Sequence, residues 1–359
     1  MMNLPSLVGT GLLALAALHV SPAEAQQPSS AACTTPTPEC TEWVAVGSGR
    51  SLVYRSHSLD LRNEAITHVM VMVHGAGRNA DDYFTTAAAS AFVAGALETS
   101  IVVSPRMASN NGQGCSDELG SNEISWNCST WRSGGPALSH PEVTSFDFLD
   151  EILKKVARRD LFPNLRSIVV TGHSAGGQVT NRYQMSSRVH DTLGIPVTYV
   201  VSNPSSYAYP GPERPTPAAW TLTANAPGYI PRVAPDLPTF RDLGGGGGCS
   251  GYDQWPYGFQ NRTGYSADQS DDQLKRQIVA RPLAYLMGEV DILPLSGFDS
   301  SCQAMAQGPT RLARSQAFAR YVNERLGGAQ EVVVVVGCGH NNRCVYTSDE
   351  GVRLLFPGM

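Results

Sequence analysis

The sequence predicts an α/β protein built on a doubly wound, mostly parallel sheet. Short, nearly continuous runs of branched apolar residues recur along the chain, as expected of strands that are covered on both faces. Segments of helical character separate most of these runs, and such alternation is typical of a parallel sheet with helices on both sides. Two long glycine-containing segments, at 106–142 and 203–281, interrupt the alternation. Loops of this length usually serve binding or catalysis, so we expect them to lie over the carboxyl ends of the strands, where open sheets bind ligands.

The first residues are typical of an export signal. An apolar run at 7–20 precedes the small-residue pattern Ala23-Glu24-Ala25, although no Lys or Arg lies before Leu7. A membrane anchor is the alternative, but the run is short for a membrane span. Export would place the protein in the periplasm or outside the cell. We therefore expect a signal peptide at 1–25, an exposed leader at 26–42 and a single domain at 43–359.

The predicted elements follow from local patterns. The segments that predict strands lie at 42–46, 51–59, 68–73, 100–105, 167–172, 197–202, 282–288 and 331–337. The segments that predict helices lie at 81–97, 144–159, 176–189 and 309–328. The second of these helices has Thr144 or Ser145 as its N-cap, with acidic residues early and basic residues late, which complements the helix dipole. The last helix ends at a Gly-Gly pair.

The eight cysteines all follow the predicted signal, and an even number in an exported chain predicts disulfides. Because loop closure favours partners that are close in the sequence, we expect each cysteine to pair with the next. Zinc binding is the alternative, but the spacings match no common zinc pattern. The expected pairs are Cys33–Cys40, Cys115–Cys128, Cys249–Cys302 and Cys338–Cys344.

A serine lies between two glycines directly after the predicted strand at 167–172. The stretch Gly172-His173-Ser174-Ala175-Gly176 matches the pattern G-x-S-x-G, which requires a strand before it and a helix after it. Larger residues in place of the glycines would collide with the strand and the helix. We predict that Ser174 is a nucleophile, and an ordinary strand–helix turn is the alternative.

A serine hydroxyl needs a base that removes its proton and a carboxylate that orients the base. After a G-x-S-x-G turn, the acid and the histidine follow in that order. His340 comes after the last strand and is the predicted base, whereas His190 ends the helix after the nucleophile and points away from the strand tips. Asp291 follows the strand at 282–288 and is the predicted acid, with Glu289 and Asp299 as alternatives.

The oxyanion of the reaction needs backbone N–H donors. One is expected from Ala175, after the nucleophile, and the other from the loop at 74–78, "HGAGR", which follows an early strand. We assign the second donor to Ala76, with Gly77 as the alternative. A merely flexible turn at 74–78 is the competing interpretation.

Aromatic residues in the two insertions are candidates for a hydrophobic substrate subsite. They equally suit a structural role, in which they anchor long loops. Asn203 to Ser206 directly follow a strand and are expected to border the same site. The residues assigned to substrate binding are Gly77, His173, Trp126, Trp131, Tyr207 and Trp255.

The motifs "HGAG", "GHSAGG", "GEVD" and "GCGH" occur in an order that resembles the α/β-hydrolase superfamily, over about residues 51–357. "HGAGRNADDYF" and "NPSSYAY" make the chain similar to secreted bacterial polyhydroxyalkanoate depolymerase and feruloyl-esterase-like enzymes. The separate substrate-binding domain and Thr-rich linker of many extracellular polymer depolymerases are missing from the sequence. The resemblance implies acyl transfer in two steps through an acyl-enzyme, with no metal or cofactor.

Charge and motifs together limit the classes of function that the sequence predicts. The net charge is −5 and the basic residues do not cluster, so neither nucleic acid nor an anionic membrane is an expected partner. We predict a secreted serine hydrolase of small-molecule or polymeric carboxylic esters. The alternatives are a hydrolase of another acyl bond, such as a peptide, amide or lactone, a polyester depolymerase, and a non-catalytic binding protein of the same fold. The oligomeric state is not predicted.

Overall fold

The computed structural model describes residues 1–2, 31–112, 114–216, 239–244, 248–295 and 297–358. Nearly all of the predicted signal peptide, and the leader up to residue 30, lie outside the described residues. Residues Ala31–Met359 form one compact unit.

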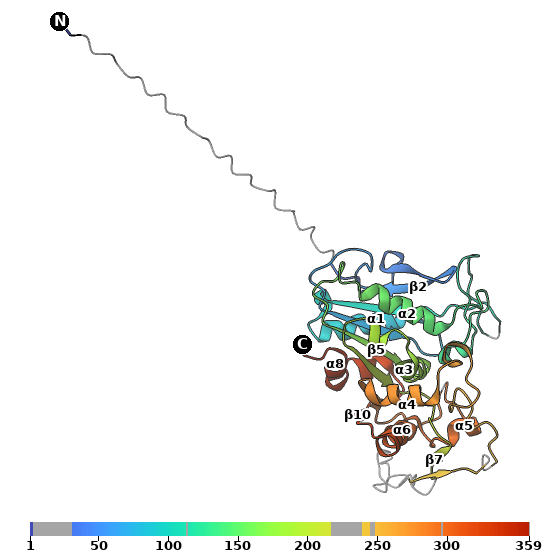
Figure 1. Ribbon diagram of the computed structural model, residues 1–359. Coiled ribbons are helices and arrows are strands. Elements are labelled where there is room, and N and C mark those ends of the chain that lie inside the picture. The colour runs from blue at the N-terminus through green and yellow to red at the C-terminus, as the bar shows by residue number, and fades with distance from the viewer. Residues whose placement is uncertain (3–30, 113, 217–238, 245–247, 296, 359) are drawn as a thin grey trace. The chain divides into compact units, whose positions relative to one another are not determined.

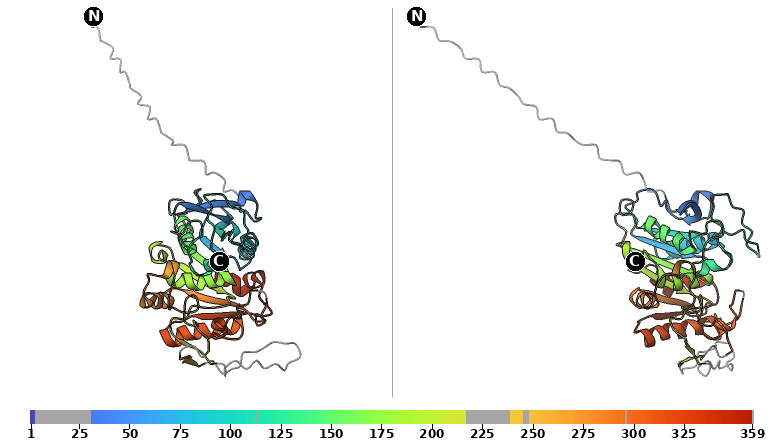
Figure 2. Two further views of the ribbon diagram at one scale, coloured as in Figure 1. Left: turned by 90° about the vertical axis from the view of Figure 1, so that its right-hand side faces the viewer. Right: turned by 45° about the vertical axis from the view of Figure 1, so that its right-hand side comes forward.

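An eight-stranded sheet forms the centre of this unit (Figure 1). The first three strands of the sheet pair antiparallel, and all the other neighbours pair parallel. Strand order follows chain order apart from an exchange of β3 and β4, so the colours run from blue to red across the unit (Figure 2). All eight predicted strands are present. In spatial order they are β1 (Thr41–Val46), β2 (Gly49–Arg55), β4 (Ser100–Pro105), β3 (His68–Val73), β5 (Ser167–His173), β6 (Val197–Ser202), β9 (Leu283–Gly288) and β10 (Glu331–Val335).

Helices cover both faces of the sheet, as a doubly wound fold requires. Successive residues of a strand point to opposite faces. Val71 of β3 packs with apolar residues of α2 and α3, whereas Met70 packs with those of α1 and α8. The helices on the first face are α2 (Ser145–Val156), α3 (Ala175–Ser186), α4 (Asp271–Ala280) and α6 (Arg311–Leu326), and those on the second are α1 (Ala80–Val93), α7 (Asn342–Tyr346) and α8 (Asp349–Leu355).

The predicted helix termini are confirmed where the sequence signal was strong. Thr144 is the N-cap of α2, and its side chain accepts from the backbone of Asp147 while Asp147 bonds back to the Thr144 backbone. This capping box satisfies two N–H groups that the helix itself cannot bond. Gly327 ends α6 with φ 72°, a left-handed conformation that favours glycine.

The insertion predicted at 203–281 is not loop throughout. It contains α4 and the short strands β7 (Glu213–Pro215) and β8 (Phe240–Asp242), which pair with each other. The sequence pattern did not predict α4, because only Leu274 and Ile278 of its ten residues are buried. The other short elements within the described residues are α5 (Cys302–Met305) and the 3-10 helices η1 (Pro38–Cys40), η2 (Leu97–Thr99), η3 (Thr130–Ser133), η4 (His190–Thr192) and η6 (Gly264–Ser266).

All eight cysteines are paired, and each pair is the predicted one: Cys33–Cys40, Cys115–Cys128, Cys249–Cys302 and Cys338–Cys344. Among the helices that the structure describes, none is both long enough and apolar enough to cross a membrane.

Candidate active site

Ser174 lies on the sharp turn between β5 and α3. Its φ is 60°, which is unusual for a residue with a side chain, and its backbone N–H donates to Ser202 O at 2.9 Å. The flanking glycines make the turn possible. A Cβ on Gly172 would lie 2.5 Å from the backbone of Gly176, and a Cβ on Gly176 would lie 2.1 Å from Val73 O. Strand, turn and helix therefore pack so tightly that Ser174 is held at the carboxyl edge of the sheet.

Ser174, His340 and Asp291 form a continuous chain of hydrogen bonds. The distance from Ser174 Oγ to His340 Nε2 is 3.0 Å, and the distance from His340 Nδ1 to Asp291 Oδ2 is 2.8 Å. The imidazole tautomer that carries its proton on Nδ1 satisfies both contacts, because Nε2 is then free to accept from the serine. The three residues follow β5, β10 and β9, so the parallel sheet brings them to one edge.

Two further side chains fix the Asp291 carboxylate. Asn203, which directly follows β6, donates to Oδ2 at 2.5 Å, and Arg311 at the start of α6 donates to Oδ1 at 3.2 Å. The side chains of Arg311 and Asp291 are 0% and 1% exposed, so this ion pair is fully desolvated. The position of Asn203 agrees with its predicted place at the border of the site. Arg311 was missed, because its contact with Asp291 depends on how α6 packs and no local motif indicates it.

The alternative acids and the alternative histidine are bonded elsewhere. Glu289 accepts from the backbone of Gly337 at 3.0 Å, and Asp299 accepts from Tyr257 Oη at 2.7 Å. His190 bonds Tyr199 Oη through Nδ1 at 3.1 Å. The geometry therefore favours Asp291 and His340 over these three residues.

The loop at 74–78, called the oxyanion loop below, lies beside Ser174. A Cβ added to Gly75 would be 3.6 Å from Ser174 Cβ. Among the described residues, no acceptor bonds the backbone N–H of Ala76, Gly77 or Ala175. These amides are available to a ligand, and Ala76 and Gly77 both remain candidates for the second donor.

A comparison with protein families identifies the family of the chain. The family model described as "Alpha/beta hydrolase family" matches residues 70–353. This chain belongs to the alpha/beta hydrolase family. No curated protein sequence matches the hydrolase.

Solved structures have the same fold. A poly(3-hydroxybutyrate) depolymerase from Bordetella parapertussis is 18% identical, with a TM-score of 0.57 over 87% of this chain and 85% of that one. A poly(aspartic acid) hydrolase from Sphingomonas sp. KT-1 is 20% identical, with a TM-score of 0.57 over 88% of this chain and 97% of that one. At these identities the likeness establishes the fold of the hydrolase.

His173 of the hydrolase lies beneath the site and not at its surface. It is 3% exposed, its Nδ1 is 3.2 Å from Tyr83 Oη, and its ring centroid is 4.5 Å from that of His340. Burial, with help from the neighbouring His340 and Arg311, lowers the pKa of His173 well below its usual value, so the ring is neutral. In this position His173 can support the His340 ring. The buried position corrects the prediction that His173 contacts the substrate.

Two of the predicted aromatic substrate residues are instead core residues. Trp126 is 0% exposed, stacks on Phe148 and donates from Nε1 to Ser51 Oγ at 3.1 Å. Tyr207 is also 0% exposed and stacks on Phe318 at 4.7 Å between ring centroids. Long loops need such apolar anchors, and for these residues the anchoring interpretation replaces substrate binding.

The other assigned residues lie nearer the surface or the oxyanion loop. Gly77 is exposed, which suits its predicted place against substrate. Trp131 is buried, and its ring forms a T-shaped contact with the His74 ring at 4.9 Å between centroids. Trp255 is half-buried, and its Nε1 donates to Ser133 O at 3.2 Å, which ties the two insertions together. The part of the chain that the structure describes contains no cluster of His, Cys, Asp and Glu able to hold a metal ion.

Proposed function

We propose that this chain is a secreted serine hydrolase that cleaves carboxylic esters through Ser174, His340 and Asp291. The observation that supports it best is the pair of hydrogen bonds that links these side chains, 3.0 Å and 2.8 Å long. Such distances are within the reach that proton transfer between nucleophile and base requires. The four disulfides support an oxidising compartment as the site of action.

The chemistry proceeds by two acyl transfers. Ser174 Oγ attacks the ester carbonyl while His340 Nε2 takes its proton, and the resulting imidazolium is stabilised by Asp291. The backbone amides of Ala175 and of Ala76 or Gly77 bind the oxyanion. His340 then returns the proton to the departing alcohol. Water, deprotonated by the same nitrogen, attacks the acyl-enzyme and releases the acid.

The substrate is an ester of small or polymeric size. One structural neighbour is named as a poly(3-hydroxybutyrate) depolymerase and the other as a poly(aspartic acid) hydrolase, so an ester and an amide polymer are both represented on this fold. An alcohol is a better leaving group than an amine and an ester carbonyl is more electrophilic than an amide carbonyl, so the same triad cleaves an ester over a lower barrier. We therefore propose esters, and not amides, as the preferred substrates.

Hydrolysis of aryl esters of graded acyl length, with aryl amides in parallel, tests the proposal. Ser174→Ala removes the nucleophile, and we expect kcat/KM for esters to fall by roughly 10⁴-fold or more. Ser121→Ala, which changes an exposed serine, is the matched control and should behave as the wild type. Equal hydrolysis by wild type and Ser174→Ala would disprove the proposal, and faster cleavage of amides than of esters would replace the ester by an amide substrate.

A further inference from the structure

The oxyanion loop is tied at its end to the first insertion. Arg78 closes the loop with φ 56°, and its backbone N–H donates to Gly75 O at 3.1 Å, which forms a tight turn around Ala76 and Gly77. The Arg78 guanidinium extends away from this turn and forms an ion pair with the carboxylate of Asp117. It also donates to Gly114 O at 3.1 Å. The Arg78 and Asp117 side chains are 12% and 19% exposed, so the pair is largely shielded from solvent.

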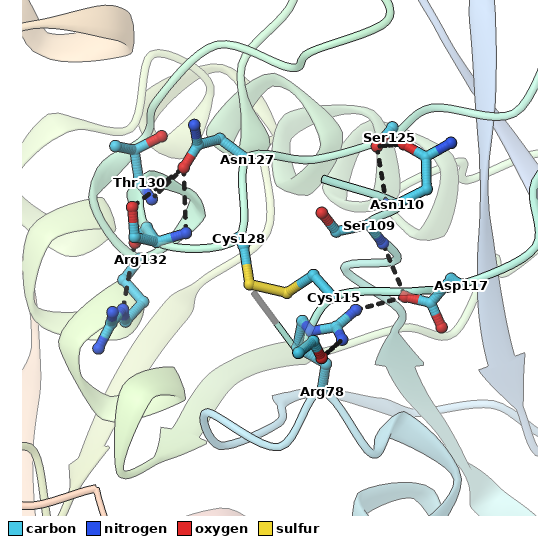
Figure 3. Close-up of a disulfide and its surroundings, with 12 residues drawn as sticks. Arg78, Ser109, Asn110, Cys115, Asp117, Ser125, Asn127, Cys128, Thr130 and Arg132 are labelled. Carbon is cyan, nitrogen blue, oxygen red and sulfur yellow. Dashed lines mark hydrogen bonds and ion pairs between the residues drawn. A yellow bond between two sulfur atoms is a disulfide. The ribbon is translucent and has the colours of Figure 1, made fainter. Parts of the chain in front are cut away.

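Two further groups bond the Asp117 carboxylate and hold it in place. The backbone N–H of Ser109 donates to Asp117 Oδ2 at 2.7 Å, and Arg106 donates to Oδ1 at 2.7 Å. Asp117 lies on the segment 115–128, called the disulfide loop below, which the Cys115–Cys128 bond closes. Figure 3 shows the Asp117 carboxylate between Ser109 and Arg78, close to this disulfide.

The same insertion also holds the beginning of the oxyanion loop. His74 Nε2 accepts from the backbone N–H of Met107 at 3.1 Å, and the His74 ring lies against Trp131. Trp131 is three residues after Cys128, and its N–H donates to Asn127 O at 3.4 Å. Both ends of the oxyanion loop therefore contact the first insertion: Arg78 pairs with Asp117 inside the disulfide loop, and His74 contacts Met107 and Trp131 on either side of it.

We propose that Asp117 is a positioning residue for the oxyanion loop, and that the Cys115–Cys128 disulfide keeps the Asp117 carboxylate in place for its ion pair with Arg78. This inference rests on the proposed function, because it assigns the loop amides to the oxyanion. Removal of the Asp117 charge leaves Arg78 and Arg106 close together without the carboxylate that separates them. Repulsion between the two cations then displaces Arg78, and with it the amides of Ala76 and Gly77.

Displaced amides stabilise the oxyanion of the transition state less well, so the chemical step becomes slower. Loss of a complete oxyanion donor lowers kcat by about 10²–10³-fold, and a displacement of about 1 Å lowers rates by up to about 10²-fold. We expect Asp117→Asn to lower kcat by about 10–100-fold and to change KM by less than about twofold. The variant keeps a side-chain oxygen for Ser109 N–H, which preserves the local fold.

The test measures kcat, KM and inhibition by an aryl trifluoromethyl ketone, whose adduct with Ser174 places an oxyanion in the same amides. The affinity for the ketone should fall in parallel with kcat in Asp117→Asn and recover in part in Asp117→Glu. Asp160→Asn is the matched control, since it removes a carboxylate from an exposed ion pair with Arg158. Equal kcat and ketone affinity in wild type and Asp117→Asn would overturn the inference. A lower kcat would also overturn it if active-site titration showed that the loss only reflects a smaller fraction of active enzyme molecules.

The disulfide arm compares Cys115→Ser/Cys128→Ser with Cys33→Ser/Cys40→Ser, which removes a disulfide beside β1. We expect the first double variant to reproduce the loss of kcat and of ketone affinity, and the second to retain both. Equal effects of the two double variants would overturn the role of the disulfide loop.

Labelling of Ser174 by a fluorophosphonate distinguishes failure of this inference from failure of the proposed function. If wild type reacts at Ser174 and hydrolyses esters while Asp117→Asn matches it, only the positioning role of Asp117 is wrong. If wild type neither reacts at Ser174 nor hydrolyses esters, the proposed function and the inference fall together.

Discussion

Asp291 and Glu289 lie two residues apart after the same strand, yet only Asp291 reaches His340. Glu289 continues the sheet, since its N–H donates to Val335 O at 3.0 Å. The chain then turns back, and the N–H of Asp291 donates to Gly288 O at 3.2 Å. The turn points the two carboxylates in different directions, toward His340 and toward Gly337.

This difference gives a prediction for the acid. Asp291→Asn should lower kcat by roughly 10⁴-fold, because the amide no longer holds the imidazole in the tautomer that accepts from Ser174. Glu289→Gln should lower kcat less than about threefold, since Glu289 bonds only backbone. Steady-state kinetics on one aryl ester measure both variants. A large loss in Glu289→Gln alone would reassign the acid.

At the scale of elements, the sequence predicted every strand of the large sheet, because buried parallel strands are nearly uniform in their apolar character. It did not predict α4, α5, α7 or α8. The polar α4 buries only two side chains, and α8 has seven residues, too few to show a helical period. The Ser174 turn, Asp291 and His340 were predictable because each follows a recognisable strand.

The supporting contacts of the site were not predictable in the same way. Arg311 and Asp117 contact residues that are 20 and 39 positions distant, and no local pattern connects the partners. The burial of Trp126 and Tyr207 was equally hidden, because an aromatic residue in a loop sequence can face either core or solvent. These features depend on packing between elements.

Asp150 joins three elements of the fold through its carboxyl group. Its carboxyl oxygens accept from Tyr183 Oη at 2.6 Å and Tyr265 Oη at 2.7 Å, so α2, α3 and η6 meet at one buried acid. Burial raises the pKa of Asp150 to about 6, although the two tyrosine hydroxyls oppose this shift. The protonated form is therefore favoured in the folded state.

A raised pKa in the folded state means that the stabilisation is complete below about pH 4 and is lost as the pH rises through about 6. We expect the free energy of unfolding of wild type, relative to Asp150→Asn, to fall by about 2 kcal/mol between pH 4 and 7, since one pKa unit corresponds to about 1.4 kcal/mol. Denaturant unfolding at a series of pH values measures this difference. A difference that is constant with pH would contradict the shifted pKa.

Across the whole Ala31–Met359 unit, the disulfides reinforce loops and not the sheet. Three of the four pairs join cysteines 6 to 13 residues apart, and only Cys249–Cys302 joins a longer segment, with a separation of 53. The sheet and its helices bury extensive apolar clusters of their own. We therefore expect the loss of single disulfides to weaken the unit without abolishing its fold.

The lengths of the segments that the disulfides close predict how much each disulfide contributes to the free energy of unfolding. In the chain-entropy model, Cys249→Ser/Cys302→Ser should cost about 4 kcal/mol of unfolding free energy, and Cys338→Ser/Cys344→Ser about 2 kcal/mol. The shorter pair brackets His340, so its removal should also reduce kcat, whereas the longer pair affects mainly stability. Denaturant unfolding and ester kinetics on both variants measure this contrast. The reverse order of unfolding free energies would contradict the entropic argument.

In the proposed reaction, the contacts around Asp291 also determine the direction in which an ester lies. With Arg311 on Oδ1, Asn203 and His340 on Oδ2, and the His173 ring against His340, the imidazole cannot rotate to exchange its two nitrogens. In the proposed reaction the same Nε2 must therefore take the proton of Ser174 and deliver it to the leaving oxygen. The alcohol portion of an ester then lies over the His340 loop, and the acyl portion points away from it. If the proposed reaction holds, the site has an alcohol side and an acyl side, and changes to residues on one side should alter selectivity for that half of the ester alone.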